Sequence, residues 1–160
     1  MKYKTELHCH SKDASGCSHE TAEGIAEKYY KAGYTTIFLT NHFAPSDGDA
    51  ENWEAKVEKR YHALELLEKA SAGRMNILMG LEFRFTQNSN DYLVFGFDKE
   101  YLLSHRDMLT MGVKNFTKMA REDGLLTIQA HPFRQAGYID HVRLFPDRVD
   151  GFEVINGNRT

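Results

Sequence analysis

Two histidines near the start of the chain have a spacing that suits metal binding. His8 and His10 stand two residues apart in the segment ELHCHS. Residues two apart on a strand point to the same face, so the two imidazoles would share one face and Cys9 would pack on the other as a small hydrophobe. Two imidazoles on one face can bind one Zn, Mn or Fe ion. Taken alone, the pair is equally compatible with two exposed or hydrogen-bonded histidines.

Glu82 is a carboxylate inside an otherwise apolar run, NILMGLEFRF. Burying a carboxylate there is costly unless a partner compensates the charge, and one or two metal ions would supply that partner. The alternative is an ion pair with Arg84, because residues i and i+2 on a strand share a face. Both interpretations place a charged group in the interior of a strand.

Polar side chains also follow three other expected strands. His42 comes after YTTIFLT, His131 closes LLTIQA before Pro132, and Asn156 follows GFEVI. A helix-cap or turn role is the alternative for His42. These residues extend the series of polar groups that begins at His8.

Two more residues are candidates with strong alternatives. Arg134 would bind a phosphate, because a guanidinium binds phosphate oxygens bidentately, but it is equally compatible with a solvated surface arginine. Asp91 opens a strand after the turn QNSN, where aspartate is common for reasons of turn geometry. The loop after His10 adds candidate ligands without a defined geometry, namely Asp13, Cys17 and His19. We interpret His62, His105 and His141 as surface residues.

Strand and helix patterns alternate along the chain and must position these side chains. Helices are expected from Ala22 to Tyr29, with Thr21 as N-cap, from Trp53 to Ala70, and from Val113 to Ala120. Strands are expected at 2–10, 34–40, 76–85, 92–97, 125–130 and 151–155, and 142–149 is irregular or weakly helical. Strands separated by helices predict an α/β fold with a parallel sheet, in which the carboxyl ends of the strands meet at one rim.

The composition fits one soluble domain and excludes several classes of protein. The 160 residues are 41% hydrophobic and 27% charged, and the net charge is −3 with no block of like charge. Nucleic-acid and membrane partners therefore have no electrostatic support. No apolar run approaches the roughly 18 residues of a membrane span, and the N-terminus lacks the apolar region of a signal peptide. Two cysteines without a secretion signal indicate free thiols in the cytoplasm.

The ordered motifs ELHCHS, LTNHF, MGLEFRF, QAHPFR and GFEVINGN resemble the PHP (polymerase and histidinol phosphatase) domain family, and most closely its small bacterial metal-dependent phosphoesterases. The resemblance implies a distorted (β/α)7 barrel that holds two or three divalent ions and hydrolyses phosphomonoesters. It also implies that Glu82 bridges ions and that Asp91 replaces a histidine ligand. The metal ligands it implies are His8, His10, His42, Glu82, Asp91 and His131, with Arg134 and Asn156 expected to bind substrate.

The chain departs from the family pattern at three places. Asn41 stands where the family often has Asp, and Ser15 and Gly16 stand where it commonly has a loop ligand, leaving Asp13, Cys17 or His19 as substitutes. The final Asp-x-His motif is absent. We therefore expect one PHP-like domain over residues 1–160 with an incomplete barrel of about six strands. It would be a fragment of a longer protein, or a neighbouring chain such as a second copy would cover the open sheet edge.

Three functions remain open at this point. The first is a metal-dependent phosphoesterase that activates water near neutral pH, needs no protein nucleophile and acts on a small phosphorylated substrate. The second is an amidohydrolase-type hydrolase, which also opens with His-x-His, although no metal-bridging lysine follows YLVFGF. The third is a metal-binding or regulatory module without turnover. Substrate selectivity would come from the loops 44–51 and 85–91.

Overall fold

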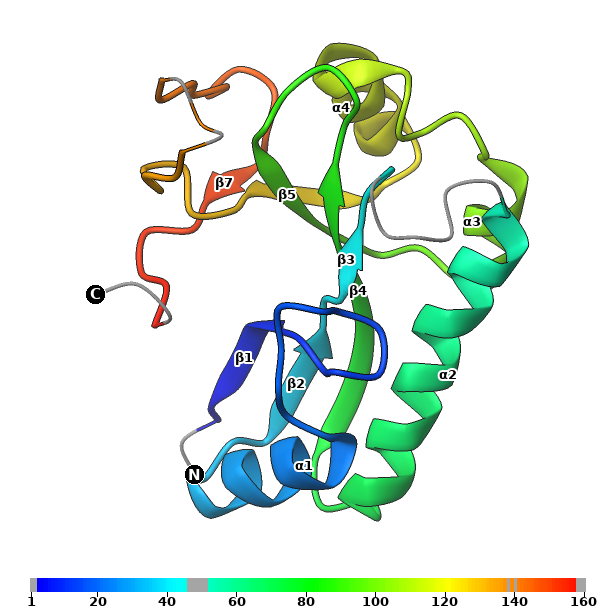
Figure 1. Ribbon diagram of the computed structural model, residues 1–160, viewed down its shortest axis with the longest axis vertical. Helices are drawn as coiled ribbons and strands as arrows, with labels where there is room; N and C mark the ends of the chain where they lie inside the picture. Colours follow the sequence, from blue (N-terminus) through cyan, green and yellow to red (C-terminus); the bar gives the residue numbers. More distant parts are fainter. Residues whose placement is uncertain (1–2, 46–51, 138, 140, 158–160) are drawn as a thin grey trace.

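A single curled sheet organises the molecule (Figure 1). The computed structural model describes residues 3–45, 52–137, 139 and 141–157. The strands are β1 (Thr5–Cys9), β2 (Thr36–Leu39), β3 (His42–Phe43), β4 (Asn76–Arg84), β5 (Asp91–Phe95), β6 (Leu126–Gln129) and β7 (Gly151–Phe152). Their order is β1-β2-β4-β5-β6-β7, with β3 also paired to β4. Within the described residues the sheet is a half-barrel open between β1 and β7, which is compatible with the expected partial barrel.

The prediction of a wholly parallel sheet is wrong at one strand. Strand β5 runs antiparallel to both of its neighbours, β4 and β6, whereas the other pairs are parallel. The reason is the short connection between β4 and β5, because a parallel connection needs a crossover of a dozen residues or more. The amino end of β5 therefore lies at the rim where the other strands have their carboxyl ends, and Asp91 stands at that end.

The second predicted strand, 34–40, corresponds to β2, and the short strand β3 lies beyond its predicted end. β2 pairs with the first half of β4, and β3 pairs with its second half, with Thr40 and Asn41 between them. Both pairings are parallel, so β3 continues the direction of β2. The register places His42 opposite Glu82.

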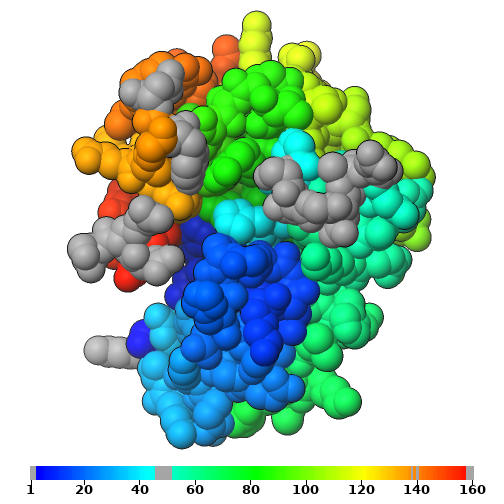
Figure 2. Space-filling view, viewed as in Figure 1, coloured from blue at the N-terminus to red at the C-terminus, as the bar shows by residue number. Residues whose placement is uncertain are grey.

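Three of the four helices in the described residues match the predicted ones. They are α1 (Ala22–Lys31), α2 (Trp53–Ser71) and α4 (Gly112–Glu122), and Thr21 caps α1 by accepting from the backbone N–H of Gly24. The sequence reading missed α3 (Lys99–Ser104), whose six residues are too few to show a helical period. The segment between β6 and β7 has no helix or strand in its described residues, and Figures 1 and 2 show it in orange on the side away from α2.

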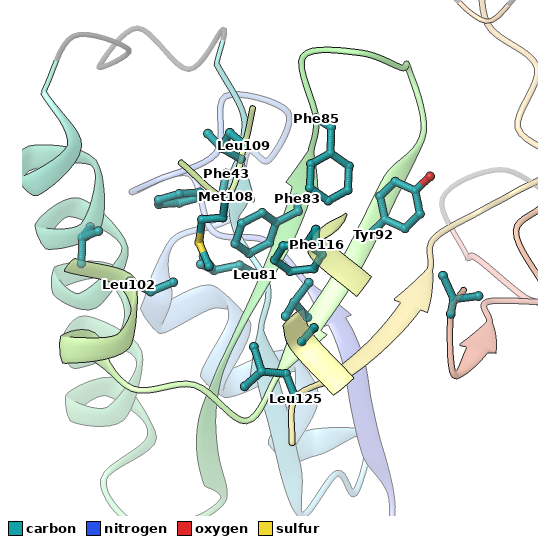
Figure 3. Packing of buried hydrophobic residues seen from close by; sticks show 14 residues of the cluster. Phe43, Leu81, Phe83, Phe85, Tyr92, Leu102, Met108, Leu109, Phe116 and Leu125 are labelled. Carbon is teal, nitrogen blue, oxygen red and sulfur yellow. The ribbon is translucent and has the colours of Figure 1, made fainter. Parts of the chain in front are cut away.

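Two large apolar clusters and a smaller third one around Leu93 and Phe95 pack against the sheet in the described residues. One large cluster contains Cys9 and Ile37 and packs against α1 and α2. The other large cluster joins the upper parts of β4 and β5 to α4, and in Figure 3 the ring of Phe116 lies beside that of Phe83, at 5.3 Å between centroids. Because successive side chains on a strand alternate between faces, burial of Leu81 and Phe83 in this cluster turns Glu82 to the opposite face.

No helix in the described part of the chain has both the length and the apolar character needed to cross a bilayer.

Candidate metal centre

Glu82 lies at the centre of four imidazoles. Its side chain is 1% exposed. The Oε1 atom lies 3.3 Å from Nε2 of His8 and 2.8 Å from Nε2 of His131. The Oε2 atom lies 3.3 Å from Nε2 of His10 and 2.7 Å from Nδ1 of His42. Four of the other five side chains suggested as metal ligands thus lie within 3.3 Å of Glu82.

The sheet explains why these side chains converge. His8 is in β1 and His10 directly follows that strand, His42 opens β3 beside Glu82, and His131 follows β6. Strands β1, β3, β4 and β6 run in the same direction, and β3 continues β2, so these side chains meet at one rim of the sheet. Cys9 is buried in the cluster beneath α1, which agrees with its expected packing role.

The arrangement fits divalent metal ions. Glu82 Oε2 is buried, and two imidazole nitrogens lie within 3.3 Å of it. Imidazole nitrogens and carboxylate oxygens gathered at one buried point are the donor set that metals such as zinc, manganese and iron use. Three groups have ligand atoms within 4.8 Å of one another: His8 with His10 and Glu82, His42 with Glu82 and Asp91, and His10 with Cys17 and His42.

Glu82 and His10 have the charge states that metal ligands need. Burial would raise the pKa of Glu82, but hydrogen bonds from His131, His42 and His8 hold it well below its usual value. Burial lowers the pKa of His10 to about 3, against the attraction of Glu82. Near neutral pH the carboxylate is therefore an anion and the His10 imidazole is neutral, as metal ligands must be.

The pKa values of His8 and His42 are raised, in contrast to that of His10. Burial lowers the pKa of His8, but its bonds to Glu153 and Glu82 outweigh burial and raise the pKa to about 9. Burial likewise lowers the pKa of His42, and its interactions with Cys17 and Glu82 raise it to about 10. These two side chains carry protons at neutral pH that a bound cation would displace.

Asp91 stands beside the centre with a second partner. Arg84 holds it bidentately, with Nε donating to Oδ1 and Nη2 to Oδ2, each at 2.7 Å. The same Oδ2 lies 3.7 Å from Nε2 of His131 and 3.9 Å from Nη1 of Arg134. Arg84 therefore forms an ion pair with Asp91, while Glu82 faces the histidines. The metal-ligand role predicted for Asp91 and the phosphate-binding role predicted for Arg134 remain predictions.

The loop after β1 is fixed to β3 by polar side chains. Asn41 accepts a hydrogen bond from the backbone N–H of Ser11 at 2.9 Å, and the hydroxyl of Ser15 accepts one from the backbone N–H of His42 at 2.8 Å. Asn41, which stands where the PHP family often has Asp, is therefore a buried residue whose side-chain amide holds this loop in place. The loop places Cys17 Sγ 3.5 Å from Nδ1 of His10. Of the three loop candidates, Cys17 alone enters a metal-capable group in the described part of the chain; Asp13 and the exposed His19 do not.

Sequence reasoning missed Glu153. Its Oε1 lies 2.8 Å from Nδ1 of His8, and its Oε2 accepts the backbone N–H of His131 at 2.8 Å. Burial would raise the pKa of Glu153, but the hydrogen bond with His8 lowers it. Asn156, expected to bind substrate, donates its side-chain amide to both oxygens of Glu153 at 3.1 Å. The signal was a carboxylate inside the motif GFEVINGN, in the segment 151–155 that the sequence predicted to be a strand.

Two buried cations of α2 also escaped the sequence reading. Arg60 is 0% exposed, and its Nε and Nη2 both donate to the backbone oxygen of His42, at 2.9 and 2.8 Å. Lys56 donates to the backbone oxygen of Ala44 at 2.5 Å. Neither residue was among the candidates that the sequence suggested. Because they anchor the backbone of β3 and the residue after it, α2 helps to hold His42 at the rim.

The remaining histidines lie outside this centre, as expected. The side chain of His62 is 68% exposed, the ring of His105 stacks on Tyr101 at 4.0 Å, and the exposed His141 accepts a hydrogen bond from Arg143.

No protein-family model matches this chain, and no curated protein matches it in sequence. Among solved structures, it is similar to a two-domain protein from Bacteroides vulgatus that contains a predicted PHP-like metal-dependent phosphoesterase. The TM-score is 0.61 and the identity 17%, over 91% of this chain and 40% of that chain. The two proteins share a fold. At 40% coverage, this chain spans less than half the length of that protein. The similarity agrees with the fold that the order of the motifs implies.

Proposed function

We propose that this chain is a PHP-type metal-dependent phosphoesterase that hydrolyses a small phosphomonoester. The observation that carries the proposal is the buried Glu82 carboxylate, with four imidazole nitrogens within 3.3 Å of its oxygens. The order of the motifs and the shared fold support it. The proposed architecture is the partial form of a (β/α)7 barrel, with the site at the carboxyl ends of its parallel strands.

The residues would hold two or three ions in overlapping groups. His8, His10 and Glu82 would bind the first, and Glu82 with His131 the second. His10, Cys17 and His42 have the donor set of a third group, with a thiolate where the family commonly has another loop ligand. A thiolate and two imidazoles favour zinc or iron over magnesium, because soft ligands select those metals.

When bound, divalent ions supply Lewis acidity, which lowers the pKa of water and offsets charge on phosphoryl oxygens. The protein supplies the rest of the site. Glu82 stays anionic and fixed between strands, so the ligands need little rearrangement. Arg134 reaches the same rim beside Asp91, where its guanidinium would bind the phosphate oxygens and orient the ester.

The test is hydrolysis of p-nitrophenyl phosphate by the purified chain with added Mn²⁺ or Zn²⁺. Glu82→Gln and His8→Ala should each lower kcat at least about a hundredfold, since each removes a ligand of the proposed centre. Glu58→Gln is the matched control, because Glu58 is an exposed carboxylate that pairs with Lys99 on the surface. Turnover that survives both site changes contradicts the proposal. Metal binding without turnover would favour a non-catalytic metal-binding module.

A further inference from the structure

Glu153 joins the two edges of the open sheet. It follows β7, one edge strand, yet its Oε1 lies 2.8 Å from Nδ1 of His8 in β1, the other edge strand. Figure 1 shows both strands on the side away from α2. The side chain is 12% exposed, so this contact lies largely out of solvent. One carboxylate thus spans the gap in the half-barrel at the rim that carries the proposed metal centre.

The contact defines which nitrogen of His8 is available to a metal. A carboxylate accepts hydrogen bonds and cannot donate them, so Nδ1 of His8 carries the hydrogen in this pair. When a cation displaces the second ring proton of His8, the lone pair resides on Nε2, the atom that lies 3.3 Å from Glu82. A metal-binding histidine usually donates its other ring N–H to a carboxylate or carbonyl, which fixes its tautomer and ring orientation. His8 and Glu153 have this geometry.

The second oxygen of Glu153 acts on another proposed ligand. Oε2 accepts the backbone N–H of His131, whose φ is +27°, a conformation that residues other than glycine rarely adopt. Unusual backbone conformations persist where surrounding contacts determine them. The bond to Glu153 is such a contact, and it accompanies the placement of His131 Nε2 at 2.8 Å from Glu82. Asn156 in turn donates to both Glu153 oxygens, which fixes the carboxylate itself.

We propose that Glu153 is a positioning residue of the metal centre, which fixes the tautomer of His8 and the backbone of His131 without binding metal itself. This inference rests on the proposed function. It explains how a sheet with two separate edges presents ligands from both sides of its opening at one rim. It also assigns Asn156 to the support of this carboxylate.

The test compares Zn²⁺ affinity, measured by competition with a chromophoric chelator, among Glu153 variants. Glu153→Ala should weaken binding by about 10–100-fold, the usual effect of losing such a partner. Glu153→Gln keeps the size but presents an amide N–H₂ to one of the two donors, so it should weaken binding similarly. Glu153→Asp keeps the charge and should recover part of the affinity. Glu58→Gln should bind as wild type does.

A tautomer measurement separates positioning from general stabilisation. In ¹H–¹⁵N spectra of the zinc-loaded protein, His8 should show a protected Nδ1–H in wild type, and Glu153→Gln should lose it. Far-UV circular dichroism shows whether each variant folds. If Glu153→Ala does not fold, the comparison of Glu153→Gln with wild type tests the proposal. If the variants fold, bind zinc as tightly as wild type and keep the Nδ1–H signal, the positioning role of Glu153 is wrong, while the metal centre still stands. A wild-type chain that binds no zinc overturns the metal centre and this role together.

Discussion

His42 lies directly opposite Glu82 across the β3–β4 pair, with its Nδ1 2.7 Å from Glu82 Oε2. This relationship depends on the short strand β3, which lies beyond the predicted strand 34–40, and on the anchoring of β3 by α2. It places an imidazole from one strand against the carboxylate of its neighbour without any intervening residue.

Arg60→Ala should destabilise the protein by on the order of 3 kcal/mol, because it removes two hydrogen bonds to the His42 carbonyl and leaves that buried group unsatisfied. Urea unfolding of the metal-free protein measures the change. The control is Arg106→Ala, whose guanidinium is 63% exposed in a surface pair with Glu54, and it should change stability by less than about 0.5 kcal/mol. Equal unfolding midpoints for Arg60→Ala and wild type would show that this anchor contributes nothing.

The two cysteines should differ in reactivity. Burial raises the pKa of the Cys9 thiol to about 12, whereas Cys17 is exposed. Ellman's reagent should therefore label one thiol per native chain quickly and the second only after unfolding, and Cys17→Ser should abolish the fast phase. If Cys17 binds metal with His10 and His42, saturating Zn²⁺ should slow the fast phase at least about tenfold. A labelling rate that zinc leaves unchanged would remove Cys17 from the proposed ligand set.

Metal affinity should rise with pH. Burial lowers the pKa values of His8 and His42, but their hydrogen-bonding partners raise them to about 9 and about 10, so both imidazoles bind protons at pH 7. A metal needs neutral imidazoles, so binding displaces up to two protons and strengthens as the pH increases from 7 toward 9. Calorimetry of Zn²⁺ binding in two buffers of different ionisation enthalpy gives the number of protons released. A value of zero at pH 7 would contradict the assigned protonation.

The same pKa values predict an opposite trend for the metal-free fold. The folded pKa of each imidazole lies above its ordinary value of 6.5, so the folded state binds more protons than the unfolded state. This contribution to stability is fully present below about pH 6.5 and is lost as the pH rises through about 9 to 10. Denaturant unfolding with a chelator present, from pH 6.5 to 10, measures the loss. The His8→Gln and His42→Gln variants should show a shallower decline than wild type.

Arg134→Ala should raise KM for a phosphomonoester by about tenfold, because the variant loses a charged hydrogen-bonding partner of the phosphate. Zn²⁺ affinity should remain within about twofold of wild type, since no ligand is changed. Arg121→Ala is a suitable control on an exposed helix face. A loss of metal affinity equal to the loss of activity would assign Arg134 to support of Asp91 instead.

Much of the site could be predicted from the sequence because it depends on strand direction and period. His8 and His10 share a face by spacing alone, and Glu82 stood out as a charge in an apolar run. The carboxyl ends of parallel strands meet at one rim, so His42 and His131 could be assigned to the same place. These inferences need only local patterns and one general rule of α/β folds.

The rest depends on contacts between residues far apart in the chain. The bidentate bond of Arg84 to Asp91 requires β5 to run antiparallel, which a strand pattern does not reveal. Burial of Arg60 depends on a backbone carbonyl 18 residues away. Glu153 acquires its partners only when the sheet curls enough to bring β7 near β1. No local period in the sequence encodes such curvature.

The most direct test of the central claim is a metal titration of wild type and Glu82→Gln, with bound zinc or manganese counted per chain by mass spectrometry. We predict two or three ions bound to wild type. Glu82→Gln should retain at most one, because the lost carboxylate is shared among the groups, and the Glu58→Gln control should bind as wild type does. A wild-type chain that binds no ion, or a Glu82→Gln variant that binds as many as wild type, would contradict the account.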